Sequence, residues 1–221
     1  PAVVVFDLVE QKQLNARPVN WPRIFDLAFS PDGRQLAITG RGVRLWDLAS
    51  DSTRPFKPHG RWAVRSVVFS GPGQRLITSG NDLAIHLWDA DSPDRTRIRL
   101  GHQRPVISLA LHPDRKHLFS GSEDGTIKFW TIAAGRDSIE IPEEWESEQT
   151  IQSVSRMTLG LESGRLFVGT DGGQLLIVNP ETGIEQVQAV GNGQVMALAA
   201  VPRSGHVVAG FRNGQVVVWD P

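Results

Sequence analysis

The segment Gly101–Trp130 reads GHQRPVISLALHPDRKHLFSGSEDGTIKFW, and this stretch decides the fold. It ends on an aromatic residue inside a short apolar run, Phe-Trp-Thr-Ile. Related four-residue patterns recur along the whole chain, centred on Phe6, Trp46, Trp88, Trp130, Val178 and Trp219. Successive centres are 40, 42, 42, 48 and 41 residues apart. A repeat of this length is far too long for a coiled coil, so each unit must hold several short elements.

The order of elements inside each repeat is constant. An alternating apolar run such as Ile24–Phe29 is followed by a turn, Ser30–Gly33, and then by two more short runs separated by a Gly-containing turn. A weakly patterned segment such as Thr96–Leu100 follows the aromatic residue and predicts a fourth, outer strand. Strand-sized runs between Pro, Asp and Gly turns, with no helical stripe, predict an all-β chain. The repeat length lies in the range of propeller blades.

The same segment also carries a family resemblance. Gly101-His102, Val106–Leu109, His112-Pro113-Asp114 and Leu118–Trp130 resemble a WD repeat almost position for position. The resemblance covers essentially the whole chain in five linked copies. It implies a WD-repeat β-propeller with five recognisable blades and an N-terminal half blade. Family habit gives seven blades as the expected number in the intact ring.

The resemblance implies that residues 1–221 form a single propeller domain, which we expect to be incomplete. The chain begins with a third strand, Ala2–Leu8, and ends with a third strand, Gln215–Asp220. Because bare strand edges invite pairing, we expect a longer protein or another chain to complete the ring. The expected divisions are a half blade at 1–20, blades at 21–62, 63–104, 105–152 and 153–193, and a blade lacking its outer strand at 194–221.

A buried hydrogen-bonded relay within a blade is also implied by the resemblance. The relay consists of a His before the first strand, a Ser or Thr on the second strand, an Asp in a turn and a Trp on the third strand. Matching residues are His102, Ser120, Asp124 and Trp130 in one blade, and Thr78, Asp82 and Trp88 in the blade before, where His59 is displaced by one residue. Elsewhere Ile38, Val168 and Ala209 replace the hydroxyl residue, so we expect those blades to rely on apolar packing alone.

Composition narrows the function classes. Twenty-four acidic and twenty-three basic residues give a net charge of −1, which argues against a protein that binds nucleic acid by neutralising phosphates. Cysteine is absent, and none of the six histidines stands in a recognised metal-ligand motif. No catalytic motif is evident and no apolar run is long enough to span a membrane. We therefore expect a cytoplasmic protein that is not an enzyme and has no cofactor, catalytic residue or metal.

An acidic stretch, Ile139–Gln149, accounts for the single long step of 48 residues. It contains five glutamates around Trp145. One interpretation is an extended, solvated loop. The other is a loop that faces a partner, with Trp145 as the anchoring side chain.

Propellers of this family mostly bind peptides or proteins on the narrow face around the central channel. The loop before each first strand, and the start of that strand, place aromatic, apolar and cationic side chains there. These are Trp21, Phe25, Trp62, Arg65, Arg104, Ile107, Arg156, Gln194 and Met196. Arg and aromatic side chains dominate interface energetics, so this rim would suit an acidic or mixed peptide. The alternative for Trp21 and Trp62 is packing across neighbouring blades.

The leading functional hypothesis is a non-catalytic scaffold that binds protein or peptide partners, with no nucleic acid or membrane partner. One alternative is a regulatory or sensor module of a larger signalling protein such as a kinase or NTPase. Another is a propeller hydrolase, which would need acidic or His side chains converging on the channel.

Overall fold

The computed structural model describes residues 2–56, 59–70, 75–89, 92–132, 139–140, 151–160, 164–180, 182–202 and 204–220. Those residues form strands joined by turns and bends and contain no helix. In particular, the described residues hold no helix with the length and apolar character that a bilayer crossing requires. The expectation of an all-β chain is confirmed.

Four sheets contain four strands each, paired antiparallel in the order of the chain. They are β3 (Asp26–Phe29), β4 (Gln35–Thr39), β5 (Val43–Asp47) and β6 (Ser52–Phe56); β7 (Val64–Ser70), β8 (Arg75–Gly80), β9 (Ala84–Asp89) and β10 (Ser92–Leu100); β11 (Val106–Leu111), β12 (His117–Ser122), β13 (Ile127–Ile132) and β14 (Ile139–Glu140); and β15 (Val154–Leu159), β16 (Leu166–Thr170), β17 (Gln174–Asn179) and β18 (Gly183–Ala189).

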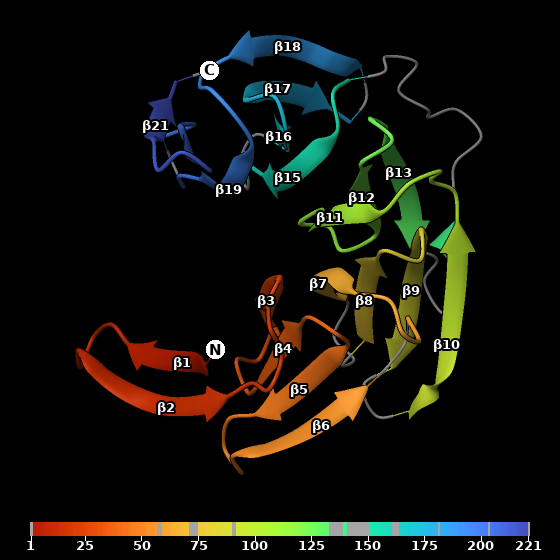
Figure 1. Ribbon diagram of the computed structural model, residues 1–221, viewed down its shortest axis with the longest axis vertical. Helices are drawn as coiled ribbons and strands as arrows, with labels where there is room; N and C mark the ends of the chain where they lie inside the picture. The colour runs from red at the N-terminus through yellow and green to blue at the C-terminus, as the bar shows by residue number, and fades with distance from the viewer. Residues whose placement is uncertain are drawn as a thin grey trace.

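Two smaller sheets stand at the ends of this series. The first pairs β1 (Ala2–Asp7) with β2 (Lys12–Pro18), and the last contains β19 (Val195–Ala200), β20 (Val207–Phe211) and β21 (Val216–Trp219). Figure 1 shows the sheets following one another around a common centre. Strands β3, β7, β11, β15 and β19 lie nearest the centre, and β2, β6, β10 and β18 lie outermost. This arrangement confirms a β-propeller. The blade boundaries and the seven-bladed ring stay predictions.

Polar contacts link the inner strands of successive sheets. The hydroxyl of Ser66 on β7 donates to Oδ2 of Asp26 on β3 at 2.7 Å and accepts from the Leu109 N–H on β11 at 3.2 Å. In the same way Ser108 on β11 accepts from the Met157 N–H on β15 at 3.1 Å. An inner strand has a free edge toward the axis, so its N–H groups need such partners.

The apolar core lies between sheets and not within any one of them. Each of the five buried clusters formed by described residues combines side chains from two consecutive sheets. Trp88, for example, packs with Leu45 of the sheet before it, and Trp130 packs with Leu87. The aromatic residue of each repeat therefore faces the preceding sheet, which explains why Trp46, Trp88 and Trp130 are almost fully buried.

Candidate functional site

The sheet β11–β14 contains a continuous hydrogen-bonded chain of four side chains. Nε1 of Trp130 donates to Oγ of Ser120 at 2.7 Å, and Oγ of Ser120 lies 2.7 Å from Nε2 of His102. The other ring nitrogen, Nδ1, lies 3.2 Å from Oδ2 of Asp124 and 3.0 Å from the hydroxyl of Thr126. These are the four residues that the resemblance to a WD repeat assigned to the relay. Thr126 joins them and was not predicted.

The carboxylate fixes the proton positions in this relay. An ionised carboxylate can only accept, so the proton of a neutral His102 sits on Nδ1, and Nε2 accepts from the Ser120 hydroxyl. Burial lowers the pKa of His102 below its ordinary value, although the charge of Asp124 acts in the opposite direction. Burial alone would raise the pKa of Asp124, but hydrogen bonds from Thr126 and from the Gln103 N–H outweigh it and leave this pKa lowered.

The sheet β7–β10 holds a second relay, and His59 completes it despite its displaced position in the sequence. Nε1 of Trp88 donates to Thr78 at 3.2 Å, Thr78 lies 2.9 Å from Nε2 of His59, and Nδ1 of His59 lies 2.7 Å from Oδ1 of Asp82. A second imidazole, Nε2 of His86, contacts Oδ2 of the same carboxylate at 2.8 Å. Burial alone would raise the pKa of Asp82. The hydrogen bonds from His59 and His86 outweigh this effect and hold the pKa well below its ordinary value.

The expectation that the other blades rely on apolar packing alone is wrong for two of them. Nε1 of Trp46 donates to Oδ1 of Asp51 at 3.0 Å, and Nε1 of Trp219 donates to Oε1 of Gln188 at 2.9 Å. In both cases the acceptor lies outside the positions of the relay. A buried indole N–H needs an acceptor, and in these sheets a nearby turn or outer strand supplies it.

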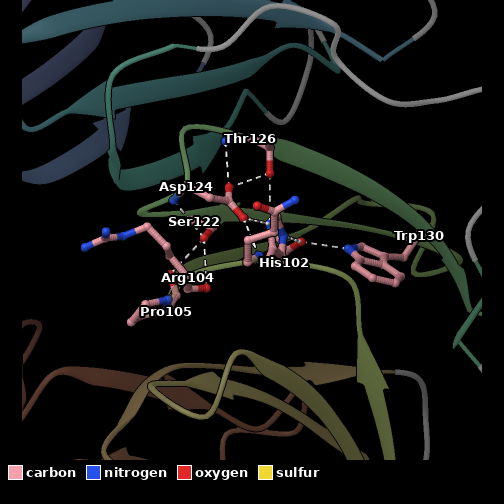
Figure 2. Close-up of polar contacts among 9 residues, drawn as sticks. His102, Arg104, Pro105, Ser122, Asp124, Thr126 and Trp130 are labelled. Carbon is pink, nitrogen blue, oxygen red and sulfur yellow. Dashed lines mark hydrogen bonds and ion pairs between the residues drawn. The ribbon is translucent and has the colours of Figure 1, made fainter.

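The relay also fixes the loop that opens its repeat, as Figure 2 shows. Oδ2 of Asp124 accepts from the backbone N–H of Gln103 at 2.8 Å. The hydroxyl of Ser122 contacts the carbonyl oxygens of Arg104 and Pro105, each at 3.0 Å. Two loops at the same end of the sheet, one before β11 and one between β12 and β13, are thereby joined. The buried polar chain thus sets the geometry of an exposed rim.

A hollow of about 460 Å³ opens at this end of the propeller. Residues from loops and inner strands of five sheets line it: Arg23, Ile24, Phe25, Arg65, Ile107, Glu123, Val154, Arg156, Asp171, Gln194, Val195, Met196 and Arg212. A second hollow of about 490 Å³ shares Phe25, Arg65, Ile107, Arg156 and Met196 and continues along the inner strands. Together the two hollows mark the central channel and its mouth.

The charged groups at this mouth are unbalanced. Four arginines line it against two carboxylates, Glu123 and Asp171. Glu123 is already engaged, because guanidinium groups of Arg65 and Arg104 each lie 3.7 Å from it. Oδ1 of Asp171 accepts from the side chain of Gln194 at 2.7 Å. The mouth therefore has an excess of cationic groups. Burial lowers the pKa of Arg65 below its usual value, though nearby Glu123 opposes this.

The predicted partner-binding residues do not all lie together. Phe25, Arg65 and Arg156 line the mouth, where the guanidinium of Arg65 lies over the Phe25 ring, 4.6 Å from its centroid. Arg104 is largely exposed and reaches the mouth through its ion pair with Glu123. The predicted Ile107, Gln194 and Met196 line it as well.

Trp21 and Trp62 lie elsewhere. Trp21 is half-buried beside the cluster formed by the sheets β1–β2 and β3–β6, with the guanidinium of Arg44 5.2 Å from its ring centroid. It lines a different hollow, which also includes Phe56 and Arg61. Trp62 is 46% exposed, with Arg61 over its ring. Trp145 lies outside the described residues. The packing alternative therefore describes the surroundings of Trp21, and Trp62 stays a candidate contact.

Two groups of side chains among the described residues have the composition of metal ligands. One is His59, Asp82 and His86, which belongs to the second relay. The other is His112, Asp114 and His117, in the turn between β11 and β12. No metal site was expected from the sequence, and neither group was identified there. His112, Asp114 and His117 lie within six residues of one another, whereas His59 lies 23 residues before Asp82. In both groups only the folded structure shows that the ring nitrogens converge.

The fold and the relays define a propeller built from WD repeats, and comparison with known proteins agrees. The family model described as "WD domain, G-beta repeat" matches residues 50–89 and 94–131. Target of rapamycin complex subunit wat1 of Schizosaccharomyces pombe is 30% identical over 156 residues, which cover 68% of this chain and 47% of that protein. The chain belongs to the WD-repeat family.

Two further relatives cover different shares of the chain. The guanine nucleotide-binding protein subunit beta of Oryza sativa subsp. japonica is 26% identical over 249 residues, covering 99% of this chain and 62% of that subunit. Protein LST8 homolog of Drosophila melanogaster is 30% identical over 148 residues, covering 65% of this chain and 44% of that protein. The chain thus spans less than two thirds of the length of each of these relatives.

The relay predicts a measurable loss of stability when its central hydroxyl is removed. In Ser120→Ala, the buried Trp130 N–H and Nε2 of His102 both lose their partner, so the free energy of unfolding should fall by about 2–4 kcal/mol. Urea unfolding at neutral pH measures this change. The control is Ser52→Ala at an exposed hydroxyl, which should change stability by less than about 0.5 kcal/mol. Equal losses in the two variants would contradict a structural role for the relay.

The depressed pKa of His102 predicts a pH dependence. The folded protein resists protonation of this imidazole, whereas the unfolded chain takes up the proton near the ordinary pKa of 6.5. The contribution of neutral His102 to the free energy of unfolding is therefore complete above about pH 6.5 and is lost as the pH falls below this value. Urea unfolding at about pH 7 and about pH 5 should show a smaller loss of stability in His102→Gln than in the unmodified chain. An identical loss in both proteins is the contrary result.

Proposed function

We propose that this chain is a non-catalytic scaffold that binds an acidic peptide or protein segment at the mouth of its central channel. The observation that carries the proposal is the hollow of about 460 Å³ with four arginines and two engaged carboxylates. Its size lies within the range of pockets that enclose compact ligands or a few side chains of a peptide.

Charge favours an acidic partner. Two of the lining arginines come from distant parts of the sequence: Arg23 precedes β3, and Arg212 lies between β20 and β21. Both are exposed. Arginine presents several donors in a planar fork that matches a carboxylate. A segment rich in Glu or Asp would therefore find several partners without displacing the internal pairs of Glu123 and Asp171.

Apolar contacts favour a peptide over a free anion. Phe25, Ile107 and Met196 line the same mouth, and Met196 is 44% exposed. Interface cores depend on such side chains, while charged groups at the rim steer the approach and fix the orientation. The partner that we propose has acidic residues next to an apolar side chain. The net charge of −1 does not favour nucleic acid or an anionic membrane surface as the partner.

The names of the relatives favour a role inside a multiprotein assembly. Two of them are named as subunits, one of a target of rapamycin complex and one of a guanine nucleotide-binding protein. We extend this to the present chain as part of the proposal, with the cytoplasm as its location. A regulatory role within a larger signalling assembly is compatible with the same surface. No specific observation favours the hydrolase alternative, since both carboxylates at the mouth already have partners.

Charge reversal at the mouth tests this proposal. Fluorescent peptides of alternating Glu and Leu, and matched peptides of Gln and Leu, are titrated with the protein at about 0.1 M salt. The Glu peptide should bind at least tenfold more tightly than the Gln peptide, and Arg23→Glu with Arg212→Glu should remove that difference.

A matched control separates a local effect from net charge. Arg34→Glu with Lys116→Glu makes the same change in charge in exposed turns at the opposite end of the sheets, and it should leave peptide binding nearly unchanged. The proposal fails if both double variants weaken binding equally, or if the Glu and Gln peptides bind the unmodified chain alike.

A further inference from the structure

The turn between β11 and β12 lies at the end of the sheet opposite the channel mouth, and its aspartate has two separate roles. Oδ1 of Asp114 accepts from the backbone N–H groups of Lys116 and His117, at 2.8 and 3.1 Å. The turn is closed further by the His112 N–H, which donates to the His117 carbonyl at 2.9 Å. Oδ1 is therefore occupied by the backbone, and Oδ2 points away from that network.

Two imidazoles converge on the remaining oxygen. Nδ1 of His112 lies 3.0 Å from Oδ2 of Asp114, and Nδ1 of His117 lies 2.6 Å from the same atom. The backbone N–H of Asp114 also approaches Nδ1 of His112, at 3.3 Å. Two imidazole nitrogens and one carboxylate oxygen therefore meet at one place, and all three atoms can ligate a metal ion that displaces the protons shared between them.

Packing holds the second imidazole in place. The ring of His117 stacks on the ring of Phe129, with centroids 4.9 Å apart and planes 19° apart. His117 also stands at the start of β12, paired with Thr131 on β13. Ligands that are already oriented lose little conformational freedom when a metal binds.

The histidines are not needed to build the turn. The equivalent turn before β4 runs from Ser30 to Gln35 and closes in the same way, with the Ser30 N–H donating to the Gln35 carbonyl at 2.8 Å. There Asp32 accepts from the Ser30 hydroxyl at 2.6 Å. The same fold element thus forms with Ser and Gln in place of the two histidines, so exchanging the two imidazoles for these residues should leave the turn intact.

We propose that this turn binds a divalent first-row transition-metal ion such as Zn²⁺ through Nδ1 of His112, Oδ2 of Asp114 and Nδ1 of His117. The three ligand atoms lie within 4.8 Å of one another. Zinc bonds of about 2.0–2.1 Å to nitrogen and oxygen place tetrahedral ligands about 3.3 Å apart, so shifts of less than about 1.5 Å suffice. Imidazole with carboxylate is a donor set that suits Zn²⁺, Cu²⁺ or Ni²⁺ and not Ca²⁺ or Mg²⁺.

Solvent access supports this turn over the other group of candidate ligands. The side chains of His112, Asp114 and His117 are each about one third exposed, at 27%, 32% and 33%, which leaves room for water to complete the coordination. His59 and His86 are almost fully buried, and His59 and Asp82 already form part of the second relay. A metal there would have to break the hydrogen bonds that hold the sheet.

Calorimetric titration of the chelator-treated chain with Zn²⁺ tests the proposal. One ion per chain should bind. His112→Ser with His117→Gln copies the turn at Ser30–Gln35, so the variant should fold, as circular dichroism and the metal-free unfolding midpoint can verify. Its Zn²⁺ affinity should be at least tenfold lower, since even the loss of an outer partner of a ligand costs about tenfold or more.

Two single variants are matched controls. His206→Gln removes an exposed imidazole from the equivalent turn before β20, where the Val201 N–H donates to the His206 carbonyl at 2.8 Å. His86→Gln alters the buried group. Both should keep the affinity of the unmodified chain. The proposal is overturned if the unmodified chain binds no Zn²⁺ at about 0.1 mM, if the double variant binds as tightly, or if His86→Gln alone abolishes binding.

Discussion

Apolar contact between neighbouring sheets is the interaction on which this structure depends. A sheet of four short strands has two faces and can cover neither of them by itself. Equivalent positions at the two ends of the series demonstrate the effect. Trp219 has a preceding sheet and is only 6% exposed, whereas Phe6, at the same position of the first sheet, is 53% exposed. Leu45 faces a following sheet and is 2% exposed, whereas the equivalent Val218 in the last sheet is 64% exposed.

The polar features depend on that packing. Once neighbouring sheets exclude water from the indole of Trp130, its N–H requires an internal acceptor, and Ser120 and His102 extend the chain to Asp124. Because Asp124 and Ser122 also hold the loop before β11, the relay connects the buried interface with the channel mouth. The opposite ends of the same strands carry the turns, including the one with two histidines. One sheet therefore presents two chemically different surfaces.

Much of this could be predicted from the sequence because it depends on local pattern. The spacing of the aromatic residues predicted the repeat, and the resemblance to a WD repeat implied the relay of His102, Ser120, Asp124 and Trp130 and a second one in the sheet before it. Features that depend on turn conformation were missed. One example is Asp51, which follows Trp46 by five residues and accepts the hydrogen bond from its indole N–H. Asp51 has a positive φ of 54°, a turn conformation that the sequence pattern does not reveal. Trp21 was expected at the mouth but packs between sheets, since the sequence does not show which face of a loop meets a neighbour.

Hydrogen exchange in the variant Trp88→Leu measures the dependence on neighbouring sheets most directly. Trp88 belongs to β9, but its ring contributes to a cluster shared with β4 and β5. We expect faster amide exchange in β4 and β5 as well as in β7–β9, with β16 and β17 close to their original protection. Faster exchange confined to β7–β9, with β4 and β5 unchanged, would contradict it.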